Sequence, residues 1–149
     1  MTIRIVEKDK VLIEKILKEP DVANEVVRRS LFEAGIRGKR LLLDGLTREG
    51  KTGVVAVDPS GQRFRRSAPG QMPSLETGNL RRSVNYEVRG AVEMEVGAGD
   101  GSSDFEYARY LEEGTEHIAP RPYIEPTVNR LHTDFIQDLE KFTKELFGV

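Results

Sequence analysis

Few residues in this chain have the types and spacing that catalysis or ligand binding requires. The glycine-rich run GAGDGS, at residues 97–102, resembles a phosphate-binding loop, but it has no lysine and does not match a dinucleotide-binding fingerprint. Asp100, Ser102 and Asp104 alternate oxygen atoms as a calcium loop does, yet the glycine and glutamate positions of such a loop do not match. We therefore expect residues 97–104 to be a flexible connector that holds no cofactor.

Other catalytic and metal-binding patterns are equally weak. His117 and His132 fall in different predicted elements, and no ligand-spaced residues surround either of them. The sequence contains no GxSxG motif and suggests no Ser–His–Asp arrangement. Glu112 and Glu113 are adjacent, so on a helix they point different ways and are expected at a solvated edge rather than as paired acid and base. We expect no catalytic, cofactor-binding or metal-binding residues and no enzyme activity.

Composition places the chain among ordinary globular proteins. Its 149 residues suit one domain with a single core, and the formal charge of −2 gives no electrostatic signature of nucleic-acid binding. The chain has no cysteine, which excludes disulfides and thiolate metal sites. No apolar run approaches the ~20 residues of a membrane span, so no membrane partner is expected. The N-terminus lacks the apolar core of a signal peptide, which predicts synthesis and retention on the cytosolic side of the producing cell.

The spacing of apolar residues predicts two long helices and a short one. Apolar residues recur at three- and four-residue steps over residues 21–46 and again over residues 124–147. A shorter helix is expected over residues 105–113. Gly35 and Gly38, inside the first long helix, either permit close packing of another element or introduce a kink, and the sequence leaves both readings open.

Before the first long helix, the pattern is less regular. Residues 2–6 alternate weakly and predict a short strand or an ordered arm. Apolar spacing over residues 11–17 indicates a helix that Pro20 ends or restarts. We interpret residues 1–20 as an N-terminal arm or short helix of a single domain that covers residues 1–149.

Between the long helices, the apolar period changes to two. Residues 52–57 and 62–66 are expected to form a hairpin around the turn DPSG, which has proline and glycine where a four-residue turn prefers them. Residues 84–88 and 91–96 are expected to form a second hairpin with one half-buried face. The sequence therefore predicts an α+β fold, in which an antiparallel β-sheet of two hairpins packs against a long N-terminal helix and a long C-terminal helix.

Two further segments attract attention because of their composition. Residues 67–79 are rich in proline and glycine, and a loop of this length is either mobile or docked onto something. Residues 107–127 contain three of the four tyrosines and are predicted to form a corner, in which Gly114 ends one helix and Pro126 lies in the first turn of the next. A corner with tyrosines and without a catalytic set suggests assembly rather than chemistry.

Each of the two segments contains a recognisable motif. The first comprises Ala68-Pro69-Gly70, Pro73, Thr77-Gly78, Leu80 and Ser83. The second comprises Tyr107-Ala108, Leu111-Glu112, Gly114-Thr115, Arg121-Pro122 and Tyr123. With these motifs the chain resembles a known family, the neck or tail-completion (head–tail connector) proteins of tailed bacteriophages. Order and spacing both agree, and the resemblance covers about residues 22–145. The sequence departs from the family pattern at Pro120 and in the 97–104 connector, both of which lie in predicted loops.

The resemblance implies a structural virion protein, made in the host cytoplasm, that forms a ring at the junction of head and tail. The ring is expected to be a hexamer, to contact a head-closure or adaptor protein on one side and a tail-terminator or tail-tube protein on the other, and to surround the genomic DNA in the channel. A head-closure or tail-terminator ring is the alternative within the same assembly. From a different class, a small nucleic-acid-binding module remains an alternative.

Ring subunits use two different patches to contact their neighbours, and tyrosine and arginine often dominate interface energy. The tyrosines of the corner can instead complete the core, and the arginines of the first hairpin can be a solvated strand edge, a contact for an acidic partner or a contact for DNA. Arg81 and Arg82 have the same readings as those hairpin arginines. The candidate interface residues are Arg63, Arg65, Arg66, Pro69, Met72, Leu75, Tyr107, Tyr110, Arg121 and Tyr123.

Overall fold

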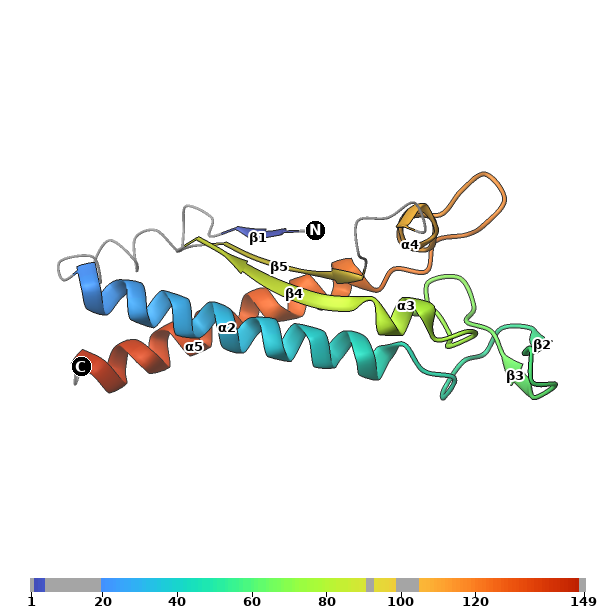
Figure 1. The fold of residues 1–149 in the computed structure, drawn as a ribbon, viewed down its shortest axis with the longest axis horizontal. Helices are drawn as coiled ribbons and strands as arrows, with labels where there is room; N and C mark the ends of the chain where they lie inside the picture. Colours follow the sequence, from blue (N-terminus) through green and yellow to red (C-terminus); the bar gives the residue numbers. More distant parts are fainter. Residues whose placement is uncertain (1, 5–19, 91–92, 99–104, 148–149) are drawn as a thin grey trace. The chain divides into compact units, whose positions relative to one another are not determined.

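The computed structural model of the chain describes residues 2–4, 20–90, 93–98 and 105–147. The elements follow in the order β1 (Thr2–Arg4), α2 (Pro20–Gly45), β2 (Val55–Val57), β3 (Arg63–Arg65), α3 (Asn79–Arg82), β4 (Val84–Arg89), β5 (Glu93–Ala98), α4 (Phe105–Glu113) and α5 (Ile124–Phe147) (Figure 1). Two long helices pack with antiparallel strands that lie between them in the sequence. The predicted α+β class is confirmed.

The three predicted helices agree closely with the observed ones. α2 starts at Pro20, which suits the first turn because proline lacks the N–H that would have no partner there. Asp21 follows in that turn, where a negative charge is favourable. The helix predicted over residues 11–17 lies outside the described residues.

The strands form two sheets. β2 and β3 form a two-stranded antiparallel sheet, and the other sheet has the order β1-β5-β4. β1 runs antiparallel to β5, with Ile3 opposite Met94. β4 and β5 are consecutive neighbours with a very short connection, which only an antiparallel hairpin allows. Both predicted hairpins are therefore present, and part of the expected N-terminal strand, residues 2–4, pairs with the second.

The chain divides into two compact units, and each is described by itself. Unit 1 consists of residues 1–38, 86–96 and 128–149, and unit 2 consists of residues 39–85 and 97–127. The long helices and the strands β4 and β5 contribute residues to both units. Unit 1 contains most of the apolar stripes that the sequence predicts, and unit 2 contains the 67–79 loop and the 107–127 corner.

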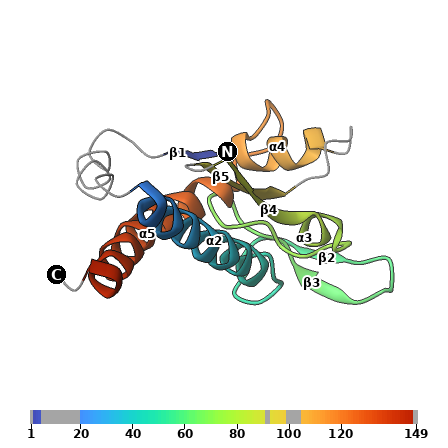
Figure 2. The ribbon, with the colours of Figure 1, turned by 60° about the vertical axis from the view of Figure 1, so that its left-hand side comes forward.

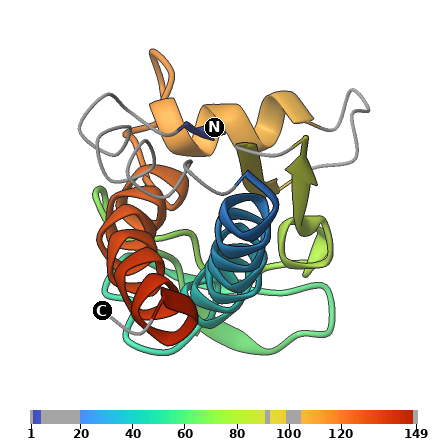
Figure 3. The same ribbon diagram turned by 90° about the vertical axis from the view of Figure 1, so that its left-hand side faces the viewer.

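In unit 1, α2 and α5 lie side by side beneath the β4–β5 hairpin (Figure 3). A methyl group on Gly38 would overlap with the Leu131 side chain of α5, and one on Gly35 would overlap with the Tyr86 ring of β4. These glycines therefore permit close packing, which answers the question that the sequence left open. The core of unit 1 is formed by Ala23, Val26, Val27, Leu31, Ala34, Met94, Val96, Leu131, Phe135, Leu139 and Phe142.

Some boundaries differ from the predictions. The one-turn helix α3 was not expected, because four residues are too few to show a helical period. Residues 97–98 were assigned to the connector, but they belong to β5, while residues 99–104 lie outside the described part of the chain. Within the described residues, no helix is long and apolar enough to cross a membrane.

Candidate protein-interaction site

The loop at residues 67–79 and the corner at residues 107–127 lie together in unit 2, although residues 80–106 separate them in the sequence. The N–H of Gly70 donates a hydrogen bond to the carbonyl oxygen of Pro120 over 2.9 Å. Gly70 has a φ of 79°, a left-handed backbone that favours glycine. The side chain of Ser67, at the start of the loop, is buried. The 67–79 loop is thus docked, and it docks onto the corner of its own chain.

Arg121 reinforces this junction from the side of the corner. Its Nε donates to the carbonyl oxygen of Ser67 (3.2 Å), and its Nη1 donates to the carbonyl oxygen of Ala119 (3.3 Å). Its backbone N–H donates to the carbonyl oxygen of Leu111 at the end of α4 (2.7 Å). We expected Arg121 at an interface, but these bonds occupy its side chain within unit 2.

Glu112 fixes the start of α5. Its Oε2 accepts hydrogen bonds from the N–H groups of Tyr123 (2.7 Å) and Ile124 (2.9 Å), and its Oε1 accepts one from the N–H of Glu125 (2.8 Å). The first N–H groups of a helix have no partner within it, and a negative charge there is favourable. We expected a solvated edge at Glu112. The structure shows a helix cap, whose sequence signal is hidden because the cap lies eleven or more residues before the groups it caps.

Tyr123 belongs to the core and not to a contact surface. Its side chain is only 2% exposed, and its hydroxyl lies 3.4 Å from the carbonyl oxygen of Ala108, to which it donates. Burial, with a further contribution from Glu112, raises the pKa of Tyr123 far above its usual range. This burial favours the alternative reading, a tyrosine that completes the core, over the assignment of Tyr123 to an interface.

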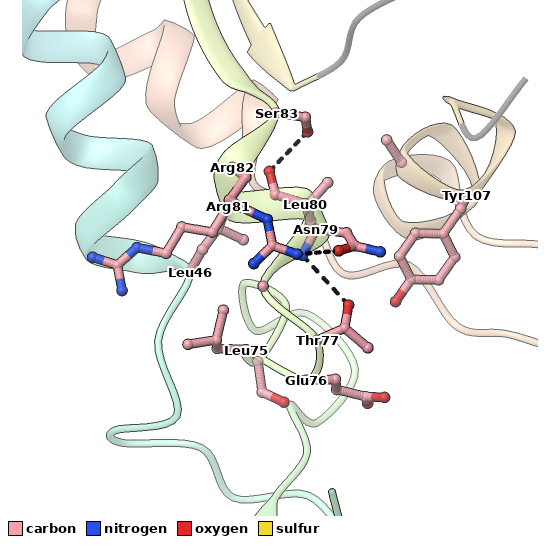
Figure 4. Close-up of a pocket in the computed structure, with 13 residues that line it drawn as sticks. Leu46, Leu75, Glu76, Thr77, Asn79, Leu80, Arg81, Arg82, Ser83 and Tyr107 are labelled. Atoms are coloured by element: carbon pink, nitrogen blue, oxygen red, sulfur yellow. Dashed lines mark hydrogen bonds between the residues drawn. The ribbon is translucent and has the colours of Figure 1, made fainter. Parts of the chain in front are cut away.

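A cavity of about 830 Å³ lies beside α3, as Figure 4 shows. Gly78 precedes α3 with a left-handed backbone, and the Ser83 hydroxyl closes the other end of α3 by donating to the carbonyl oxygen of Leu80 (2.9 Å). The Tyr107 ring faces this segment from α4 (Figure 4). The cavity is lined by Leu46, Ser74, Leu75, Glu76, Thr77, Gly78, Asn79, Leu80, Arg81, Arg82, Ser83, Tyr107 and Ala108.

The charges around this cavity are mostly positive. Arg81 and Arg82 are exposed, and Arg82 donates to the side-chain oxygen of Asn79. Glu76 is the acidic residue of the lining, and Arg66 pairs with it over 2.9 Å. Leucine and tyrosine side chains lie next to arginines that have no carboxylate partner in the described part of the chain. This combination suits a protein segment that carries apolar and acidic side chains.

Of the other predicted residues on this side, Leu75 and Tyr107 line the cavity and Pro69 is exposed. Tyr107 is 54% exposed, and Tyr110 is also exposed on the same helix. Partial burial raises the pKa of Tyr107. Met72 is half-buried because its sulfur packs closely against Gly45 at the end of α2, so its part in unit 2 is structural.

The β2–β3 hairpin carries the three predicted arginines. Arg63 and Arg65 are exposed on β3, and Arg65 donates to the carbonyl oxygen of Gly53 (3.2 Å). Arg66 follows the strand and is engaged by Glu76. The structure thus places Arg66 near the cavity, while Arg63 and Arg65 have no acidic partner among the described residues.

The turn of this hairpin is held by Asp58. Its Oδ1 accepts hydrogen bonds from the Ser60 hydroxyl (2.6 Å), the Ser60 N–H (2.9 Å) and the Gln62 N–H (2.9 Å). Its Oδ2 pairs with Arg48 over 2.7 Å. The Ser60 hydroxyl, the Arg48 guanidinium and the Gln62 N–H together hold the pKa of Asp58 well below its usual value. The predicted four-residue turn is confirmed, and the N–H of Gly61 closes it on the carbonyl of Asp58.

Two cations that we did not single out from the sequence bind backbone carbonyls of the 67–79 loop. The guanidinium of Arg48 donates to the carbonyl oxygen of Leu75 (2.7 Å) and lies 4.5 Å from the centre of the Phe64 ring. The ammonium of Lys51 donates to the carbonyl oxygen of Met72 (2.8 Å), and burial lowers its pKa. Nothing in the local spacing marks these residues, because the loop carbonyls that they bind are more than twenty residues away in the sequence.

The residues considered for metal binding and catalysis form no such centre in the described part of the chain. Within residues 2–4, 20–90, 93–98 and 105–147, no group of three or more carboxylates or imidazoles could hold a metal ion. His117 is exposed. Asp100, Ser102 and Asp104 lie outside the described residues. Comparisons of the chain with protein-family models, with curated proteins and with solved structures found no match.

Proposed function

We propose that this protein is a non-enzymatic structural component of a tailed-phage virion. It forms a ring, expected to be a hexamer, at the junction of head and tail. There it completes the tail, joins it to the DNA-filled head and surrounds the channel for the genome. Its partners are other copies of itself, a head-closure or adaptor protein, and a tail-terminator or tail-tube protein.

One observation supports this proposal above the others. Residues from both segments that resemble the neck family line the same cavity: Thr77, Gly78 and Leu80 come from the first segment, and Tyr107 and Ala108 come from the second. The Gly70–Pro120 hydrogen bond joins the same two segments. A resemblance in two separate stretches is easier to explain if both stretches build one surface.

The cavity suits contact with another protein better than contact with a small substrate. Tyr107 and Leu75 supply apolar area, and Arg81 and Arg82 supply charge at an exposed edge. Apolar anchors with a polar rim are typical of protein interfaces. We place the contact with the neighbouring head or tail protein at this cavity.

The experiment measures mass and binding to phage particles. Light scattering of the purified protein, alone and with tails or filled heads, should show a monomer that becomes a ring or sediments with one of these particles. Arg81→Glu should weaken that binding, because it reverses a charge at the cavity edge. Arg130→Glu, an exposed charge reversal on α5, should leave the binding unchanged. A protein that ignores both heads and tails would contradict the proposal.

A second candidate function has its own observation. Arg63 and Arg65 are exposed without an acidic partner among the described residues, as expected for a contact with phosphates. A nucleic-acid-binding module predicts DNA affinity that falls steeply with salt. A head-closure or tail-terminator ring is the alternative within the virion, and the particle that recruits the protein distinguishes it.

A further inference from the structure

One face of the β2–β3 hairpin combines valines and arginines. The strand register places Val55 opposite Arg65 and Val57 opposite Arg63, so these four side chains share a face. Val55 is 46% exposed and Val57 is 62% exposed. The opposite face carries Phe64, which is buried under the guanidinium of Arg48. We call the exposed side, formed by Val55, Val57, Arg63 and Arg65, the hairpin face.

The hairpin face is unusual for a surface that contacts only water. A two-stranded sheet is only marginally stable alone, and on the hairpin face two exposed valines of β2 lie beside two arginines of β3, where contact with water does not stabilise the apolar side chains. Arg63 and Val55 also line a hollow of about 500 Å³. DNA would engage the arginines but leave the valines without a partner, because a phosphate backbone offers no apolar surface. A protein with acidic and apolar side chains fits both.

Such a partner surface exists on the same chain, at the turn 115–118 in the corner. The N–H of Thr115 donates to the carbonyl oxygen of Ile118 (2.8 Å), and the Thr115 hydroxyl accepts from the N–H of Ile118 (3.1 Å), which holds the turn in one conformation. Ile118 is 40% exposed. Glu116 is exposed and has no cationic partner among the described residues. We call Glu116 and Ile118 the acidic turn.

Within unit 2, the hairpin face and the acidic turn cannot contact each other. The loop that carries the acidic turn projects from the opposite side of the unit to the β2–β3 hairpin, as Figures 1 and 2 both show. A contact between two different patches on opposite sides of a subunit is head-to-tail, and such contacts generate rings or filaments.

We propose that the hairpin face of one copy of this chain binds the acidic turn of the next copy. Val55 and Val57 pack against Ile118 of the second copy, and Arg63 and Arg65 pair with its Glu116. This inference rests on the proposed function, because it names the two patches through which a ring would close.

Cysteine cross-linking tests the contact cleanly, because the chain has no cysteine of its own. Val57→Cys protein, isotopically labelled, is mixed with unlabelled Ile118→Cys protein, first alone at high concentration and then on tails and on filled heads. We expect a mixed disulfide under at least one of these conditions. Gln137→Cys, at an exposed position on α5, serves as the control and should not cross-link to either variant. Disulfides between two Val57→Cys chains only, or none under any condition, would overturn the proposal.

A charge exchange provides the second measurement. Arg65→Glu in the Val57→Cys chain should lower the yield of mixed disulfide about tenfold, because it places like charges opposite each other. Glu116→Arg in the Ile118→Cys chain should restore the yield. Circular dichroism confirms that each variant is folded. If Arg65→Glu has no effect on the yield, or if the second exchange does not restore it, the contact is not the one proposed.

The outcomes separate this inference from the proposed function. Protein that sediments with tails or heads but forms no mixed disulfide would refute the contact and leave the virion role standing. Protein that forms the mixed disulfide alone but ignores both particles would refute the virion role and leave the contact standing. If Arg65→Glu instead abolishes a salt-sensitive affinity for DNA and no mixed disulfide forms, the hairpin face binds nucleic acid and the contact is refuted.

Discussion

The carboxylate of Glu112, at the end of α4, lies 2.7 Å from the backbone nitrogen of Tyr123, directly before α5. With its second oxygen on the N–H of Glu125, this side chain satisfies three N–H groups at the start of a 24-residue helix. The bonds fix the path of the corner between the two helices. They also hold the end of α4 in place relative to the first residues of α5.

Removing this cap should destabilise the protein. We expect Glu112→Ala to lower the free energy of unfolding by about 1–2 kcal/mol, because capping groups typically contribute that much. Glu112→Gln should cost less, because its amide oxygen still accepts a hydrogen bond. Glu113→Gln is the matched control, since Glu113 forms an exposed ion pair with Arg109 and its replacement should cost less than about 0.5 kcal/mol. Urea unfolding measures all three, and equal losses for the Glu112 and Glu113 variants would contradict the capping role.

Helix propensity alone predicts that replacing a glycine of α2 by alanine would stabilise the protein, but the packing around Gly38 predicts the opposite effect. Alanine is better than glycine in a helix by about 1 kcal/mol, but overpacking a core costs about 1–3 kcal/mol. Gly38→Ala should therefore destabilise the protein, because the new methyl group overlaps with Leu131. Glu33→Ala, at an exposed position of the same helix, should change stability little.

A double-mutant cycle identifies the cause. Leu131→Val removes the methyl groups nearest to Gly38, so the pair Gly38→Ala and Leu131→Val should be less destabilising than the sum of the single changes. Thermal unfolding is sufficient to measure the coupling. Additive effects would show that the helix contact does not limit residue size at Gly38.

The sequence allowed prediction where the controlling interactions are local. Leu131, Phe135 and Leu139 repeat at helical spacing, and all three are buried on α5. The strand period and the DPSG turn similarly located both hairpins. Such patterns depend on neighbours a few residues away, and these are visible in a single sequence.

The rest depends on contacts between distant residues. Tyr107 and Tyr123 are the same residue type in one predicted corner, yet one is exposed and the other is buried. Arg48 and Glu112 act on backbone groups in other segments, and no spacing rule identifies such partners. Residue type therefore located the candidate surface, but only the structure separated its core from its exposed part.

Because of the hydrogen bonds to Asp58, we expect the free energy of unfolding to depend on pH in the acid range. The pKa of Asp58 is lowered from 3.8 in the folded protein, so the unfolded chain binds this proton more readily. The stability that Asp58 contributes is therefore fully present above about pH 4–5 and is lost as the pH falls through the folded pKa. Asp58→Asn should thus be less stable than the wild type at pH 7, and the difference should shrink as the pH drops below 4.

Urea unfolding at several pH values between 7 and 2 measures this difference. Asp44→Asn is the control, because Asp44 is exposed on α2 and its replacement should change stability little. A gap between wild type and Asp58→Asn that stays constant down to pH 2 would show that the hydrogen bonds of Asp58 do not stabilise its charged form.

The two tyrosines of the corner allow stability to be separated from binding. Tyr123→Ala should lower the free energy of unfolding by about 3–5 kcal/mol, as is typical when a large buried aromatic side chain is truncated. Tyr107→Ala should change it by less than about 0.5 kcal/mol, because that side chain is largely exposed. If the cavity beside α3 is the contact for a virion partner, Tyr107→Ala should nevertheless weaken sedimentation with tails or heads. Loss of stability in the Tyr107 variant would mean that this ring supports the fold. Full binding of the variant to both particles would mean that the ring does not contact a partner.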